Sequence, residues 1–250
     1  KNIKITKDID LKSIERQTHG YSGADLANLA NEAALLAARN NKDAVTLVEL
    51  QSAIERVMAG PEKKSRVINP QEKKIISYHE SGHALLALLM PEADPLHKVS
   101  VLPRGITLGY TLTPPTEDRY IVTKKKLMAD ITVALGGRVS EEMVFSDTST
   151  GAHNDLEVST NIARRMVCEF GMSDKLGNLT LGRRHGQVFL GRDLYEEDRN
   201  YSDDTAREID AEIKNIIDIC YKRAKDLLTA NKERLNNLAA ALLEKEVLDG

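Results

Sequence analysis

Hydrophobic residues recur every three or four positions along most of the chain, which is the spacing of amphipathic helices. The clearest case runs from Ala24 to about Asn40, where leucine and alanine residues define one buried face. The same spacing predicts further helices at residues 10–18, 46–60, 70–90, 123–145 (interrupted at Gly136 and Gly137), 152–170, 202–230 and 233–243. Segments of β character are Val99–Leu102 and Thr107–Leu112, with weaker strand or loop segments at 178–182 and 187–190. The pattern predicts a fold that is mainly α with a small β-sheet.

The chain is expected to divide after residue 60. Three short helices occupy the first 60 residues, and Gly60 and Pro61 are followed by the charged stretch 62–66, which is typical of a linker. A new helix then begins at Asn69, an N-cap residue, with Pro70 in the first helical position. We therefore expect a small helical unit at 1–60 and a larger unit that takes up the rest of the chain.

Composition and charge narrow the class of protein. The 250 residues include 35 Lys and Arg against 38 Asp and Glu, which gives a net charge of −3. A near-neutral balance argues against nucleic acid as a partner. The longest apolar run, Ala84–Met90, has seven residues, far fewer than the roughly 20 that span a bilayer. Cys168 and Cys220 lack metal-ligand spacing and are expected to be reduced thiols.

One motif carries chemistry, the sequence His79-Glu80-Ser81-Gly82-His83 inside the predicted 70–90 helix. Residues four apart share a helix face, so both imidazoles can bind one metal ion. Glu80 can then reach a water on that ion, take its proton and pass it to a leaving amine. The pattern predicts a catalytic zinc site with His79 and His83 as ligands and Glu80 as general base and acid. The alternative is a chance spacing of two histidines.

A catalytic zinc needs a third protein ligand, and local spacing does not identify it. The strongest candidates are His153 and Asp155, where a Thr-Gly loop enters a helix, and the residues alone leave these two equal. An acid in the first helical turn is also common without any metal. The remaining candidates are Glu157, Glu141, Glu142, His97 and His185.

Four stretches of the second unit resemble the FtsH family of ATP-dependent, membrane-anchored zinc metalloproteases. They read SYHESGHALLALL at 77–89, VSVLPRGITLGYT at 99–111, LGGRVSEEMVF at 135–145 and GAHNDLEVSTNIARRMV at 151–167. Upstream, GYSGADLANLANEAALLAARNN at 20–41 resembles the C-terminal helical subdomain of the family's AAA+ ATPase module. One departure is HESGH where HEAGH is usual, and it removes no catalytic group.

The resemblance implies that Asp155 is the third zinc ligand, with one zinc per chain. It also implies that 1–60 is an AAA+ lid subdomain and 66–250 a zinc metalloprotease domain. Family members assemble as hexamers and degrade unfolded or misassembled membrane proteins and short-lived soluble proteins. The implied location is the cell inner membrane, with this region facing the cytoplasm, or the matrix or stroma in an organelle. The membrane anchor would be an N-terminal segment outside this sequence.

The sequence contains no phosphate-binding loop of the G-x-x-x-x-G-K-[ST] form. We therefore expect that this stretch of chain does not bind ATP with useful affinity, and that ATP serves only the full-length protein. The chain is interpreted as a C-terminal piece that holds the end of an ATPase module and a complete protease domain.

Two rival functions remain at this point. One is a catalytically silent oligomeric assembly module with a structural metal site, although structural zinc normally has four protein ligands and no use for Glu80. The other is a metallohydrolase that acts on a small molecule.

Two further segments have open interpretations. Thr107–Leu112 is either an edge strand that pairs with an extended substrate or part of a closed hairpin. The acidic stretch from Asp193 to Asp204 is interpreted as a solvated loop rather than a calcium or partner site.

Overall fold

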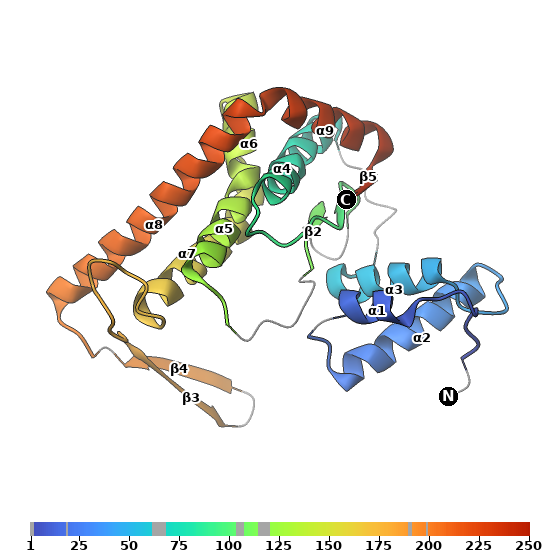
Figure 1. Cartoon of the computed structure of the whole chain (residues 1–250), viewed down its shortest axis with the longest axis horizontal. Coiled ribbons are helices and arrows are strands. Elements are labelled where there is room, and N and C mark those ends of the chain that lie inside the picture. The colour runs from blue at the N-terminus through green and yellow to red at the C-terminus, as the bar shows by residue number, and fades with distance from the viewer. Residues whose placement is uncertain are drawn as a thin grey trace.

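The computed structural model describes residues 3–18, 20–61, 69–103, 108–114, 121–189, 192–198 and 200–250. Helices dominate these residues, accompanied by a three-stranded sheet and a two-stranded hairpin (Figure 1). The prediction of a mainly α fold with a small sheet is confirmed. The expected linker at 62–66 and residues 104–107, which include the start of the predicted strand 107–112, lie outside the described residues.

The N-terminal helical unit (residues 3–61) has a core of its own. Its helices are α1 (Leu11–Gln17), α2 (Gly23–Arg39) and α3 (Leu47–Ala59). Their buried face is formed mainly by Leu29, Ala33 and Ile54. Thr46 and Glu49 form a capping box at the start of α3, and Glu49 also accepts hydrogen bonds from Lys42 and Asn40 across the α2–α3 turn. These bonds, the one from Lys42 first, lower the pKa of Glu49 to about 2.

The C-terminal unit (residues 69–250) is arranged around helix α4 (Pro70–Leu89). The other helices are α5 (Lys124–Ala134), α6 (Gly136–Phe145), the 3-10 turn η1 (Thr150–Ala152), α7 (His153–Cys168), α8 (Asp203–Ala230) and α9 (Lys232–Lys245). From Ser77 to Ala87, every residue of α4 except Tyr78 is buried, because α5, α6, α8 and α9 pack around it. The polar residues of α4 therefore need partners from these neighbours.

Helices α4 and α6 cross with their backbones in contact. A Cβ atom added to Gly82 would lie 2.3 Å from the carbonyl oxygen of Gly136, so only glycine fits at this point. The hydroxyl of Ser140 on α6 donates to the carbonyl of Tyr78 on α4 at 2.6 Å. This close approach accounts for a glycine in the middle of a helix that Gly82 otherwise weakens.

A small antiparallel sheet lies against α4. It consists of β1 (Lys98–Ser100), β2 (Tyr110–Leu112) and β5 (Val247–Asp249), in the order β2-β1-β5. Val99 pairs with Thr111 on one side and with Leu248 on the other. Among the described residues β2 is thus an edge strand. The C-terminal strand β5 was not predicted, because three residues after a helix carry no pattern of their own.

The predictions between α7 and α8 are correct only in part. The structure has a hairpin of β3 (Arg183–Phe189) and β4 (Arg192–Asp198), which includes part of the segment 187–190, and 178–182, predicted as strand or loop, is loop. The first part of the acidic stretch 193–204 belongs to β4 and is not a loop. In the backbone register of the hairpin, Arg183 lies opposite Asp198 and Phe189 opposite Arg192.

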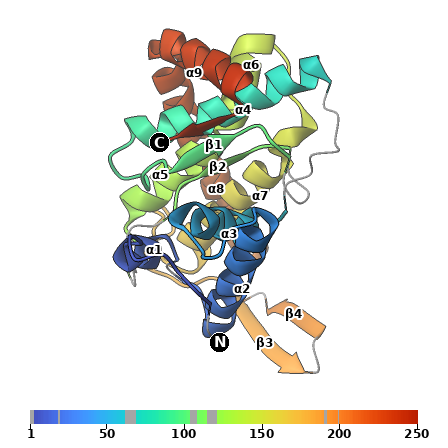
Figure 2. The same ribbon diagram turned by 90° about the vertical axis from the view of Figure 1, so that its right-hand side faces the viewer.

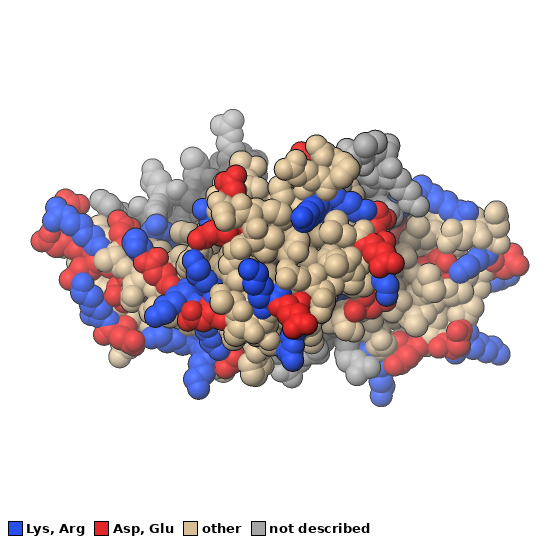
Figure 3. Space-filling view, turned by 90° about the horizontal axis from the view of Figure 1, so that it is seen from above, with Lys and Arg blue, Asp and Glu red and all other residues tan. Residues whose placement is uncertain are grey.

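The surface carries charges of both signs. On the face seen in Figure 3, Lys and Arg side chains alternate with Asp and Glu, and no broad patch of one sign is visible. No helix among the described residues has the length and hydropathy of a membrane span.

The crossing of α4 and α6 gives a test of the fold. Gly82→Ala should lower the free energy of unfolding by about 3 kcal/mol, because the added methyl group forces the two backbones apart. The higher helix propensity of alanine recovers only about 1 kcal/mol. Urea denaturation followed by circular dichroism measures this. Gly23→Ala in α2 is the matched control, since no atom lies within 4 Å of its added Cβ. Equal stability of Gly82→Ala and the parent chain would contradict the close crossing.

Candidate metal centre

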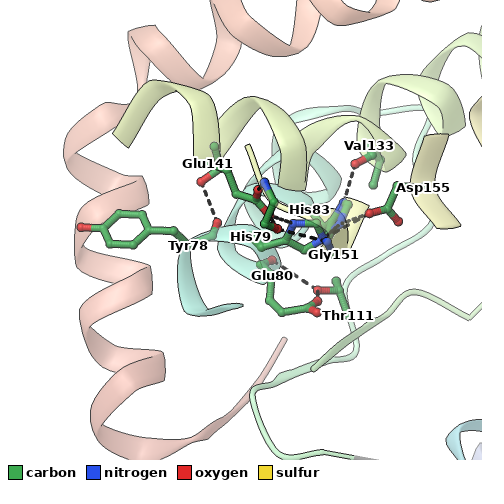
Figure 4. A network of polar contacts seen from close by, with 11 residues as sticks. Tyr78, His79, Glu80, His83, Thr111, Val133, Glu141, Gly151 and Asp155 are labelled. Carbon is green, nitrogen blue, oxygen red and sulfur yellow. Dashed lines mark hydrogen bonds and ion pairs between the residues drawn. The ribbon is translucent and has the colours of Figure 1, made fainter. Parts of the chain in front are cut away.

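Two histidines of α4 and an acid of α7 meet at one point. The Nε2 atoms of His79 and His83 are 3.0 Å apart, and Oδ2 of Asp155 lies 3.1 Å from the first and 3.5 Å from the second (Figure 4). Ligand atoms at about 2.0–2.1 Å from a tetrahedral zinc ion are about 3.3–3.4 Å from one another. The three side chains therefore fit the ligand set of a zinc ion. They are the one such group of three among the described residues.

The second nitrogen of each imidazole has a fixed partner. Nδ1 of His83 donates to the carbonyl oxygen of Val133 on α5 at 2.8 Å, and Nδ1 of His79 donates to Glu141 on α6 at 2.6 Å. Glu141 is held in turn by the backbone N–H and hydroxyl of Ser149. These bonds orient both rings so that their Nε2 atoms face Asp155, which is the arrangement that orients histidine ligands in metal sites.

The backbone of α6 also fixes the His79 ring. A Cβ atom built on Gly137 would lie 2.4–2.6 Å from three atoms of that imidazole. The ring therefore packs directly against the main chain at the start of α6. Any side chain at this position would push His79 away from Asp155.

The charges of the site stabilise one another. Burial by itself lowers the pKa of His79, but its hydrogen bonds to Asp155 and Glu141 outweigh burial and raise it to about 10. Burial raises the pKa of Asp155, and the two histidines more than reverse this, so that it lies below its usual value. Both acids thus favour the protonated form of His79. Protons and a metal ion compete for the imidazole nitrogen.

Glu80 lies beside the histidine pair and shares a cavity with it. Its carboxylate accepts a hydrogen bond of 2.7 Å from the hydroxyl of Thr111 on β2. Burial raises the pKa of Glu80 above its ordinary value. The cavity measures about 860 Å³ and also borders Asp155 and the apolar residues Val158 and Ile162 of α7. A carboxylate placed here can exchange protons with a group in the cavity.

The other candidate ligands lie elsewhere. Glu142 accepts from Tyr221 of α8, and Glu157 is exposed on α7. His153 lies in the cavity wall without belonging to the group of three. The backbone of His97 forms hydrogen bonds with Leu112 and Gly250 at the edge of the sheet. The side chain of His185 lies outside the described residues.

Three supporting residues were not recognised as such from the sequence. Glu141 was considered only as a ligand, whereas it contacts His79 from behind. Thr111 and Val133 carried no signal, because their contacts with the motif depend on how β2 and α5 pack against α4.

Comparisons with known proteins support this description. Residues 66–250 match peptidase family M41, and residues 8–52 match the AAA+ lid domain. Similar proteins include the ATP-dependent zinc metalloproteases FtsH of Pseudothermotoga lettingae, Bacillus subtilis and Thermotoga maritima, which are 51%, 53% and 47% identical to this chain. Each alignment covers 100% of this chain but only 40%, 39% and 41% of the relative.

The chain thus spans about two-fifths of the length of these relatives. Within that part, the family match covers the central helix, the sheet and every residue that surrounds the histidine pair. With most of the chain matched in this way and about half of its positions identical to the relatives, the resemblance to the FtsH family is confirmed, and the chain belongs to peptidase family M41.

Proposed function

We propose that residues 66–250 form a zinc-dependent endopeptidase domain. In this proposal His79, His83 and Asp155 hold one zinc ion, and Glu80 is the general base and acid. The observation that carries it is the spacing of the three ligand atoms, 3.0–3.5 Å, with a buried carboxylate beside them. The relatives' shared name, zinc metalloprotease, supports the same chemistry.

The mechanism assigns a separate task to each group. Bound zinc would supply a water whose pKa falls from about 15.7 to about 7 and would polarise the peptide carbonyl. Glu80 takes the proton of the attacking water and delivers it to the leaving amine. Glu141 and the Val133 carbonyl keep the histidines in the tautomer that leaves Nε2 free for the metal. No acyl-enzyme forms, because water itself attacks the carbonyl.

An extended polypeptide is the proposed substrate. Strand β2 borders the cavity and is an edge strand among the described residues, so a substrate main chain can pair with it beside Glu80. Pairing through the main chain tolerates many side chains. This fits the degradation of unfolded and misassembled membrane proteins and of short-lived soluble proteins.

We extend the proposal to the whole protein. The match of residues 8–52 to an AAA+ lid domain and the relatives' name support ATP-dependent proteolysis in the full-length protein, with ATP bound outside this stretch. The resemblance further supports a hexamer, anchored in the cell inner membrane by an N-terminal segment, with this region facing the cytoplasm, or the matrix or stroma in an organelle.

Glu80→Gln should abolish cleavage while leaving zinc in place. Removal of a general base lowers the rate by about 10²–10⁴-fold, and the substitution touches no ligand atom. Elemental analysis and cleavage of an unfolded protein, on the parent chain and the variant, measure both effects. Glu142→Gln is the matched control, because Glu142 faces Tyr221 and not the cavity. This variant should cleave the unfolded protein at the rate of the parent chain.

The same two proteins, assayed with small esters as well as with an unfolded protein, separate the rival functions. Zinc in both proteins without cleavage in either would favour an assembly module with a structural metal. Cleavage of small esters but not of polypeptides would favour a small-molecule hydrolase. Absence of zinc from the parent chain would contradict the metal site.

Asp155→Asn should lower the affinity for zinc by at least about tenfold, because a neutral amide replaces the carboxylate ligand. Competition with a chelator measures the affinity. His153→Gln is the control, since His153 lies in the cavity wall outside the group of three, and its zinc affinity should be unchanged. Weaker zinc binding by His153→Gln, together with unchanged binding by Asp155→Asn, would identify His153 as the third ligand.

Peptides with one N-methylated amide at a time test the pairing with β2. Alternate N–H groups of a paired strand point toward its neighbour, so alternate methylations should lower cleavage about tenfold each. The peptides leave the protein unchanged, which removes folding as an explanation. A uniform or absent effect along the peptide would rule out strand pairing.

A further inference from the structure

Strand β2 presents one side chain to the general base. The hydroxyl of Thr111 donates to Oε2 of Glu80 at 2.7 Å and also lies 3.2 Å from the carbonyl oxygen of the same residue (Figure 4). A hydroxyl has one proton to donate, and the shorter contact is the one to the carboxylate. The β-branched threonine side chain is stiff, so this bond restricts how the carboxylate can turn.

The neighbouring residue of β2 belongs to the opposite face of the strand, because successive side chains alternate. The hydroxyl of Tyr110 lies 3.4 Å from Oε2 of Glu55 in the N-terminal helical unit. On β1, Lys98 forms an ion pair with Oε1 of the same glutamate. The register confirms the shared face, since Ser100 pairs with Tyr110 and Lys98 lies two residues before Ser100.

Glu55 is a buried acid at the boundary between the two units. It lies on α3 and is 7% exposed. Figure 2 shows α3 next to strands β1 and β2. Lys98 also lies 3.6 Å from the exposed Asp249, so separation would leave the buried Glu55, rather than Lys98, with its charge uncompensated. Such a contact resists separation more than a surface ion pair does. The helical unit thus contacts Tyr110 of β2, and the next residue of the same strand, Thr111, contacts Glu80.

We propose that strand β2 couples the position of the N-terminal helical unit to the orientation of the general base. Glu55 holds the strand from one face through Tyr110 and Lys98, and Thr111, a positioning residue, holds Glu80 from the other. The inference rests on the proposed zinc endopeptidase function. A shift of the helical unit then moves the Glu80 carboxylate without touching a zinc ligand.

The first arm of the test removes the hydroxyl of Thr111. Thr111→Val should lower kcat for a peptide by about tenfold or more, with KM and zinc content unchanged, because a misplaced base slows only the chemical step. Thr111→Ser keeps the hydroxyl and should return kcat to within about twofold of the parent chain. Equal rates for the parent chain and Thr111→Val would overturn the proposal, and so would equal losses in both variants.

The second arm acts from the helical unit. Glu55→Gln removes the charge that Lys98 contacts and should lower kcat about three- to tenfold at unchanged zinc content. Glu49→Gln is the matched control, because Glu49 accepts its hydrogen bonds from Lys42, Asn40 and Thr46, which lie within the helical unit. Its kcat should equal that of the parent chain. Unchanged kcat in Glu55→Gln, or the same loss in both variants, would overturn the coupling.

A readout without catalysis separates this inference from the proposed function. If the parent chain does not cleave peptides, the proposed function fails, and thermal unfolding still tests the contact. The Tm shifts of Thr111→Val and Glu80→Gln should then be non-additive in the double variant, since the two side chains share one hydrogen bond. Glu55→Gln should also speed amide hydrogen exchange in β2. Additive Tm shifts together with unchanged exchange would overturn the inference.

Discussion

The buried polar face of α4 is the constraint on which the rest of the C-terminal unit depends. Helices pack around α4 on nearly every side, so its two imidazoles and its carboxylate have to find partners inside the protein. Each partner comes from a different element: the Val133 carbonyl from α5, Glu141 from α6, Asp155 from α7 and Thr111 from β2. The site therefore fixes the mutual arrangement of the elements that enclose it.

One buried polar atom of α4 lacks such a partner. The hydroxyl of Ser81 has no hydrogen bond among the described residues, in a side chain that is fully buried. An unsatisfied buried hydroxyl costs about 1–3 kcal/mol. Alanine at this position would avoid that cost. The contrast with His79, whose two nitrogens both have partners, shows that the packing around α4 satisfies the histidine motif and not every polar side chain on the helix.

How far the sequence predicts the structure depends on the range of the interactions. His79 and His83 could be placed together because both lie on one helix, where spacing alone sets their geometry. The choice between His153 and Asp155 stayed open on the residues alone, because it depends on how α7 approaches α4, more than 60 residues away along the chain. Strand β5 was missed for the same reason, since it pairs with β1, which lies far earlier in the chain. The hairpin β3–β4 pairs neighbouring segments, and the sequence indicated only the part at 187–190.

The acids around His79 fix both the geometry and the charge of the candidate metal centre. Asp155 and Glu141 contact its two ring nitrogens at 3.1 Å and 2.6 Å, and the three candidate ligand atoms lie close to the separations of a tetrahedral site. The same two contacts raise the pKa of His79. Since protons and a metal ion compete for an imidazole nitrogen, a metal bound here is expected to be held less tightly as the pH falls. The acids that make His79 basic are the same groups that hold it in place as a ligand, so the affinity of the site and its preformed shape have a common origin.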